Sequence, residues 1–204
     1  MVHLLYLSSF IFLLFPPWLL AGSNIPLSVQ SSTSIVLKGT STLHDYECLS
    51  TVLHGVIEMD TLLKSFKSIE ISIPVKSIHS GNSSMDENMY DALKANDNPD
   101  IKFSLININN DTKSTLVNQD SIIQLQGKLS IAGKEQMIEL PVIVVKDNNG
   151  IVTVRGKKKL LMTEYGIEPP TFMLGILKTG NEVSVEFKVD LKSFESQTQL
   201  IPTN

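Results

Sequence analysis

The chain has 204 residues, of which 42% are hydrophobic and 19% charged, and its formal net charge is −4. A chain of this size and composition can build one domain with a sizeable core. Arg155 is the single arginine and Cys48 the single cysteine. A nucleic-acid-binding surface is therefore not expected, and an intramolecular disulfide is excluded.

The N-terminal segment is apolar and ends in small residues. The first 23 residues contain no Lys, Arg, Asp or Glu, and the run ends in Ala21-Gly22-Ser23, the kind of residues that signal peptidase accepts. We predict a secretory signal over residues 1–23, which places the mature protein in the periplasm or outside the cell. An uncleaved membrane anchor is the alternative, because the run approaches the length that spans a bilayer. The pair Pro16-Pro17 near its end disfavours that alternative.

Segments that alternate between apolar and polar residues recur along the remainder of the chain. This period of two is typical of a strand with one dry and one wet face. Eight segments show it: 35–39, 53–59, 69–75, 101–105, 123–131, 138–144, 152–156 and 183–191. The phase slips where Leu105 is followed by Ile106 and Ile108, which predicts a β-bulge or a change of exposed face.

One helix is expected between the third and fourth of these strands. Ser84 and Glu87 have the spacing of a capping box, with Ser84 as the N-cap residue. Helical periodicity then places four apolar side chains on one face: Met85, Met89, Ala92 and Leu93. Residues 96–99 end the helix at a proline.

Four predicted strands carry a glycine on their apolar face, namely Gly39, Gly55, Gly127 and Gly156. A glycine weakens a strand, so its position usually has a reason. Either the strands bend there to close a barrel, which we favour, or the missing side chains leave room for a ligand.

Many alternating strands with one short helix predict an all-β fold, either a closed antiparallel barrel or a sandwich. An eight-stranded barrel has an interior that is filled by side chains or that holds one small ligand. No phosphate-binding loop, nucleophile elbow or metal-ligand spacing occurs. A pair of neighbours such as His44-Asp45 points to opposite faces of a strand, so no metal, catalytic residue or cofactor is expected.

The chain resembles the YceI-like family in four segments: 37–45 (LKGTSTLHD), 73–103 (IPVKSIHSGNSSMDENMYDALKANDNPDIKF), 125–133 (LQGKLSIAG) and 162–180 (MTEYGIEPPTFMLGILKTG). The resemblance implies an exported, lipocalin-like, eight-stranded antiparallel barrel over residues 24–192, followed by a tail over 193–204. It also implies binding of a polyisoprenoid or another long-chain lipid. Tyr46 stands where many relatives have tryptophan.

With the resemblance, the predicted function is non-enzymatic binding of a polyisoprenoid, quinone-like or fatty-acyl chain inside the barrel. A transient contact with a membrane is expected as well. Side chains from the strands, the helix and the Pro169-Pro170 loop are predicted to contact the ligand: Leu53, Ile71, Met85, Met89, Leu93, Phe103, Leu125, Met162, Tyr165, Phe172, Met173 and Phe187.

Two alternatives to lipid binding remain at this stage. The barrel could be filled and act as a structural or protein-interaction module. The chain could also be a hydrolase or lyase that uses His44 or Cys48. The run Lys157-Lys158-Lys159 is interpreted as a solvated strand end, in preference to a phosphate or anionic-lipid site.

Overall fold

The computed structural model describes residues 24–60, 65–109, 121–172 and 176–193; the predicted signal and tail lie outside these ranges, apart from Ser193. Strands dominate. In chain order the elements are β1 (Asn24–Val29), β2 (Ser34–Ser41), β3 (Tyr46–Ser50), β4 (His54–Asp60), β5 (Ser65–Pro74), η2 (Val75–Ser77), α1 (Ser83–Ala92), β6 (Asp100–Asn109), β7 (Ser121–Ile131), β8 (Lys134–Lys146), β9 (Ile151–Leu161), η3 (Met162–Tyr165), β10 (Thr171–Phe172) and β11 (Leu177–Ser193).

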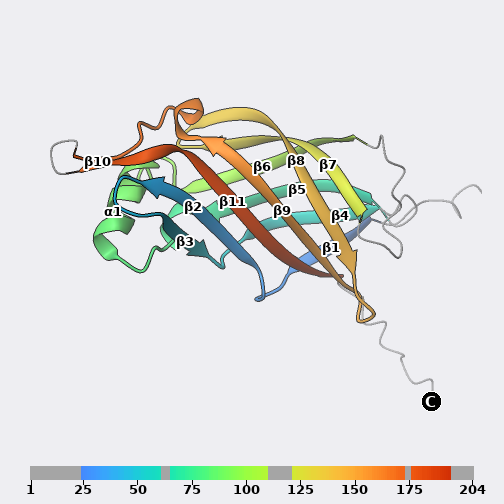
Figure 1. Cartoon of the computed structure of the whole chain (residues 1–204). Coiled ribbons are helices and arrows are strands. Elements are labelled where there is room, and N and C mark those ends of the chain that lie inside the picture. Colours follow the sequence, from blue (N-terminus) through green and yellow to red (C-terminus); the bar gives the residue numbers. More distant parts are fainter. Residues whose placement is uncertain (1–23, 61–64, 110–120, 173–175, 194–204) are drawn as a thin grey trace, which may run out of the picture.

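Eight of these strands close into an antiparallel barrel, as predicted. The ring runs β1-β4-β5-β6-β7-β8-β9-β11, and the pairing of β1 with β11 closes it. The long strand β11 pairs with β1 near its C-terminal end and with β2 over residues 179–188. The β2–β3 pair therefore continues the wall toward one end of the barrel. Figure 1 shows α1 and β10 at that same end.

Every predicted strand is present, and three further strands were not predicted: β1, β3 and β10. The predicted bulge is confirmed, because the pairing of β6 with β7 shifts register between Leu105 and Asn107. The shift leaves Ile106 on the outside, 55% exposed. Among the described residues, no helix is long and apolar enough to cross a membrane.

The predicted N-cap of the helix was wrong by two residues. The cap is Asn82, whose side-chain oxygen accepts a hydrogen bond from the backbone N–H of Met85 at 3.1 Å. Asn and Ser are comparable caps in energy, so the spacing to Glu87 was not decisive. The predicted apolar face is correct, since Met85, Met89, Ala92 and Leu93 all face the barrel interior.

Candidate functional site

The barrel interior is divided into a packed end and a hollow end. The packed end is filled by buried apolar side chains that include Leu27, Ile123, Val144 and Val152. Beyond them lies a cavity of about 550 Å³ that extends toward the α1 end. The interior is therefore neither wholly filled nor wholly open.

Cross-strand register shows how the cavity wall is layered. One layer contains Val185, with Lys158 and Leu37 as its partners on the two neighbouring strands. The next layer toward α1 contains Val183, flanked by Leu160 and Gly39. Val183 and Val185 belong to the inner face that the alternation of β11 predicted, and directly paired residues on neighbouring strands share that face.

Helix α1 and the segment that follows β9 form the wall at the hollow end. Met85, Met89, Ala92 and Leu93 from the helix line the cavity, as do Met162, Tyr165 and Ile167. Tyr165 is only 2% exposed, and it packs with Ile131 and Ile167 against Leu93. Burial, with a smaller effect of Glu164, raises the pKa of Tyr165 to about 12. Its hydroxyl is therefore neutral at ordinary pH.

Three of the four glycines that were predicted on the inner face, Gly39, Gly127 and Gly156, are covered by aromatic rings. A Cβ atom at Gly127 would lie 2.5 Å from the Phe103 ring, and one at Gly156 would lie 2.6 Å from the Phe187 ring. At Gly39 the Tyr46 ring occupies the same space. The glycines thus do not leave room for a ligand directly. They let aromatic rings from neighbouring strands lie against the wall, an arrangement that also stabilises a glycine within a sheet.

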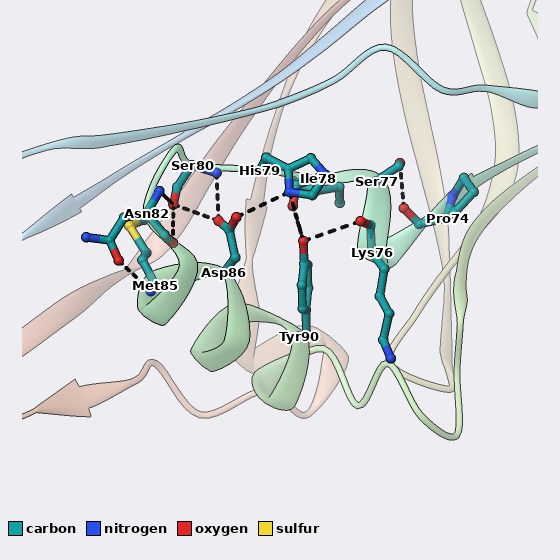
Figure 2. Close-up of polar contacts among 10 residues, drawn as sticks. All are labelled: Pro74, Lys76, Ser77, Ile78, His79, Ser80, Asn82, Met85, Asp86 and Tyr90. Atoms are coloured by element: carbon teal, nitrogen blue, oxygen red, sulfur yellow. Dashed lines mark hydrogen bonds and ion pairs between the residues drawn. The ribbon is translucent and has the colours of Figure 1, made fainter.

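Helix α1 is held in place by a polar network around Asp86 (Figure 2). The buried carboxylate accepts hydrogen bonds from the backbone N–H and the hydroxyl of Ser80, both at 2.7 Å, and lies 3.2 Å from Nδ1 of His79. The backbone of His79 in turn pairs with Leu49 of β3. Tyr90, one helical turn after Asp86, donates to the carbonyl of Ile78 at 2.8 Å. Strand β3, the loop and the helix therefore form one unit beside the cavity.

Asp86→Asn is expected to lower the free energy of unfolding by about 1–3 kcal/mol, because the charge that strengthens the hydrogen bonds is lost and one carboxylate oxygen becomes an amide nitrogen that cannot accept. Burial alone would raise the pKa of Asp86, but the hydrogen bonds from Ser80 and His79 outweigh it and hold the pKa below its ordinary value of 3.8. The stability contributed by this carboxylate is thus present above about pH 4 and is lost as the pH falls further. Urea unfolding at several pH values measures both effects.

The matched control for this substitution is Asp91→Asn, on the exposed face of the same helix. The charge change is identical, but no buried acceptor is lost, so the stability should stay within about 0.5 kcal/mol of the wild type. Equal effects of the two substitutions at neutral pH would show that the Asp86 network does not anchor α1.

The candidate catalytic side chains do not form a reactive arrangement. Cys48 is buried, and burial, with smaller effects of Asp86 and Glu47, raises the pKa of its thiol to about 11. The thiol is therefore protonated at neutral pH and is a weak nucleophile. His44 is exposed at the mouth, where its Nδ1 lies 2.9 Å from the carbonyl oxygen of Asp45. Within the described ranges, no group of three His, Cys, Asp or Glu side chains could hold a metal ion.

Ten of the twelve predicted ligand contacts line the cavity: Leu53, Ile71, Met85, Met89, Leu93, Phe103, Leu125, Met162, Tyr165 and Phe187. Phe172 belongs to β10, but the structure does not describe its side chain, and Met173 lies outside the described residues.

Other residues that line the cavity were not predicted, among them Leu37, Val185 and Lys158. The first two could have been found from the strand alternation.

The run of three lysines was interpreted as a solvated strand end. This interpretation was wrong for its middle member, Lys158. Lys157 and Lys159 lie outside and pair with Glu186 at 2.8 Å and with Glu182 at 2.7 Å. Lys158 is half-buried and lines the cavity. Alternation along β9 gives it the same face as Val154 and Leu160.

The fold and the cavity define a class of protein: an eight-stranded antiparallel barrel with one packed end and one hollow, mostly apolar end. The protein-family model of the YceI-like domain matches residues 28–191 of the sequence. The chain therefore belongs to the YceI-like family. No curated protein matches it.

Solved structures share this fold. Burkholderia cenocepacia BcnA is 17% identical, with a TM-score of 0.66 over 80% of this chain and 99% of its own. A polyisoprenoid binding domain from Saccharophagus degradans is 13% identical, with a TM-score of 0.65 over 83% of this chain and 99% of its own. A Campylobacter jejuni YceI protein is 18% identical, with a TM-score of 0.57 over 72% of this chain and 84% of its own. At these identities the likeness concerns the fold alone.

Proposed function

We propose that this protein is a non-enzymatic binding protein for one long-chain lipid, such as a polyisoprenoid, quinone-like or fatty-acyl chain, held in the hollow end of the barrel. The observation that carries the proposal is the 550 Å³ cavity, which is lined mainly by aliphatic and aromatic side chains. Its volume falls within the range of about 300–1,000 Å³ that is usual for small-molecule sites. The name of the Saccharophagus degradans neighbour, a polyisoprenoid binding domain, supports the same ligand class.

Burial of the ligand's apolar chain is sufficient as a source of affinity. Each methylene removed from water contributes about 0.8 kcal/mol, so ten methylenes contribute about 8 kcal/mol before the cost of ordering the chain. The methionines of α1 suit this role, because an unbranched thioether side chain adapts to ligands of different shape. Specificity for the apolar chain itself is therefore expected to be low.

Export is part of the proposal. The apolar segment over residues 1–23 ends in small residues and carries no charged side chain, which supports a secretory signal and a periplasmic or extracellular site of action.

A transient contact with a membrane would let the ligand enter and leave. Leu43 and Ile176 support such a contact, since their side chains are 69% and 73% exposed. The two lie near one another, because the N–H of Thr42 donates to the carbonyl of Lys178 at 3.0 Å. Leu43 also lines the cavity.

The affinity for saturated fatty acids should rise with chain length and then level off once the cavity is full. Titration calorimetry on the full chain, with acids of increasing length, measures this series. The rise should approach fourfold per methylene, the equivalent of about 0.8 kcal/mol. An affinity that does not depend on chain length would contradict burial of the chain and would favour a filled barrel that acts as an interaction module.

A further inference from the structure

Among the described residues, those that line the cavity include basic side chains and no acidic ones. The whole chain has 21 acidic residues against 17 Lys and Arg. The described residues that line the cavity nevertheless include Lys158, Lys178 and His44, and no Asp or Glu. A lining drawn at random from this chain would carry acidic residues at least as often as basic ones.

Lys158 occupies the most informative position of the three. It lies one layer inside the layer of Val183 and Leu160, beside Val185. Its side chain is half-buried. No ion pair joins it to another residue in the described part of the chain, whereas both neighbouring lysines are paired on the outer surface.

An ammonium group beside an apolar wall is stable only if it reaches water or meets an anion. The long alkyl stem of Lys158 can lie along the wall while its Nζ reaches the mouth of the cavity. No described carboxylate competes for it there, so the group is available to a ligand.

Lys178 extends the basic surface outward from this point. Its side chain is exposed and lines the cavity. Its backbone is fixed on both sides, because its N–H donates to Oγ1 of Thr42 at 3.1 Å and its carbonyl accepts from the N–H of Thr42 at 3.0 Å. His44 lies in the same turn, where its N–H donates to Oγ of Ser41 at 3.2 Å. The basic groups thus come from β9, β11 and the turn after β2.

We propose that the cavity mouth is an anion subsite, with Lys158 as its principal contact and Lys178 at its outer edge. The ligand is then an amphiphile with a carboxylate or phosphate head on a long apolar chain, rather than a neutral quinone, alcohol or ester. This inference rests on the lipid-binding function proposed above. Charge-assisted hydrogen bonds to Lys158 fix the head, and the cavity takes the chain.

The test compares palmitate, hexadecyl phosphate and methyl palmitate, which share a chain and differ in the head. Calorimetry on the full chain should show both anions binding about tenfold more tightly than the ester, since a hydrogen bond to a charged group contributes at least that much. Lys158→Met should weaken binding of both anions about tenfold and leave the ester unchanged. Lys158→Arg should keep the preference for anions.

Lys159→Met is the matched control, because it removes the same charge from the neighbouring, outward-facing position. It should leave all three affinities unchanged. The control therefore distinguishes a direct contact between Lys158 and the anion from the effect of the protein's net charge on binding. Added salt should weaken binding of the anions and not of the ester.

Equal affinity of the wild type for the acid and the ester would overturn the anion subsite while leaving the lipid-binding function intact. The same holds if Lys158→Met binds all three probes as the wild type does. Absence of binding for all three probes would overturn the lipid-binding function itself.

Discussion

Val185→Trp is expected to abolish binding of long-chain lipids. Val185 lies on the inner face of β11, between Lys158 and Leu37 in the layer just inside the mouth. An indole at this point occupies the space through which a chain must pass. Loss of only four buried methylenes removes about 3 kcal/mol, so the affinity for palmitate should fall at least about a hundredfold. Displacement of a fluorescent fatty acid measures the change.

The barrel itself should remain folded in this variant, because the larger side chain enters a cavity rather than a packed core. The free energy of unfolding should change by no more than about 1 kcal/mol. Glu182→Trp is the control on the same strand, since Glu182 faces outward in an exposed ion pair with Lys159. Normal lipid binding by Val185→Trp would show that the ligand does not enter the cavity.

Gly55→Ala is expected to have the largest effect on stability. Gly55 has a φ of 133°, and a Cβ atom there would lie 2.0 Å from the carbonyl oxygen of Glu70 and 2.7 Å from the Cα of Ile71. These are backbone atoms of β5, the strand with which β4 pairs, so the clash can be relieved only by separating the two strands. The free energy of unfolding should fall by at least about 3 kcal/mol.

Gly150→Ala separates the steric clash from the backbone strain. Gly150 also has a positive φ, of 79°, but a Cβ there would meet nothing within 4 Å. Only the cost of the left-handed conformation remains, which is about 1–2 kcal/mol. Urea unfolding curves of the two variants compare them directly. Equal losses of stability would contradict the close approach of β4 and β5; failure of Gly55→Ala to fold would agree with it.

Most of the barrel could be predicted from sequence because its strands alternate with a period of two over long stretches. β3 could not be predicted, because its large apolar residue lies on the exposed face and small residues lie on the buried face. Cys48 and Ser50 are buried there, while Leu49 is 44% exposed. β1 is short and contains Pro26, which weakens a strand assignment. Pairing with β4 and β11, not local preference, makes it a strand.

The apolar part of the candidate site could also be predicted, since the alternation and the helical face identify which side chains point inward. The covering of glycines by aromatic rings could not, because Phe187 and Gly156 are distant in sequence and meet only through the register of β9 and β11. Lys158 is a different case. The alternation predicted over 152–156 places Lys158 on the inner face only if it is extended by two residues, and three consecutive lysines suggested a solvated strand end instead.

Native mass spectrometry of the protein purified from its own source, with lipid analysis after organic extraction, tests the central claim most directly. We predict one copurified lipid per chain, with a long apolar tail, that disappears in Val185→Trp and is retained in Glu182→Trp. A protein that carries no lipid and takes up neither fatty acids, quinones nor polyisoprenoids when they are added would contradict the account.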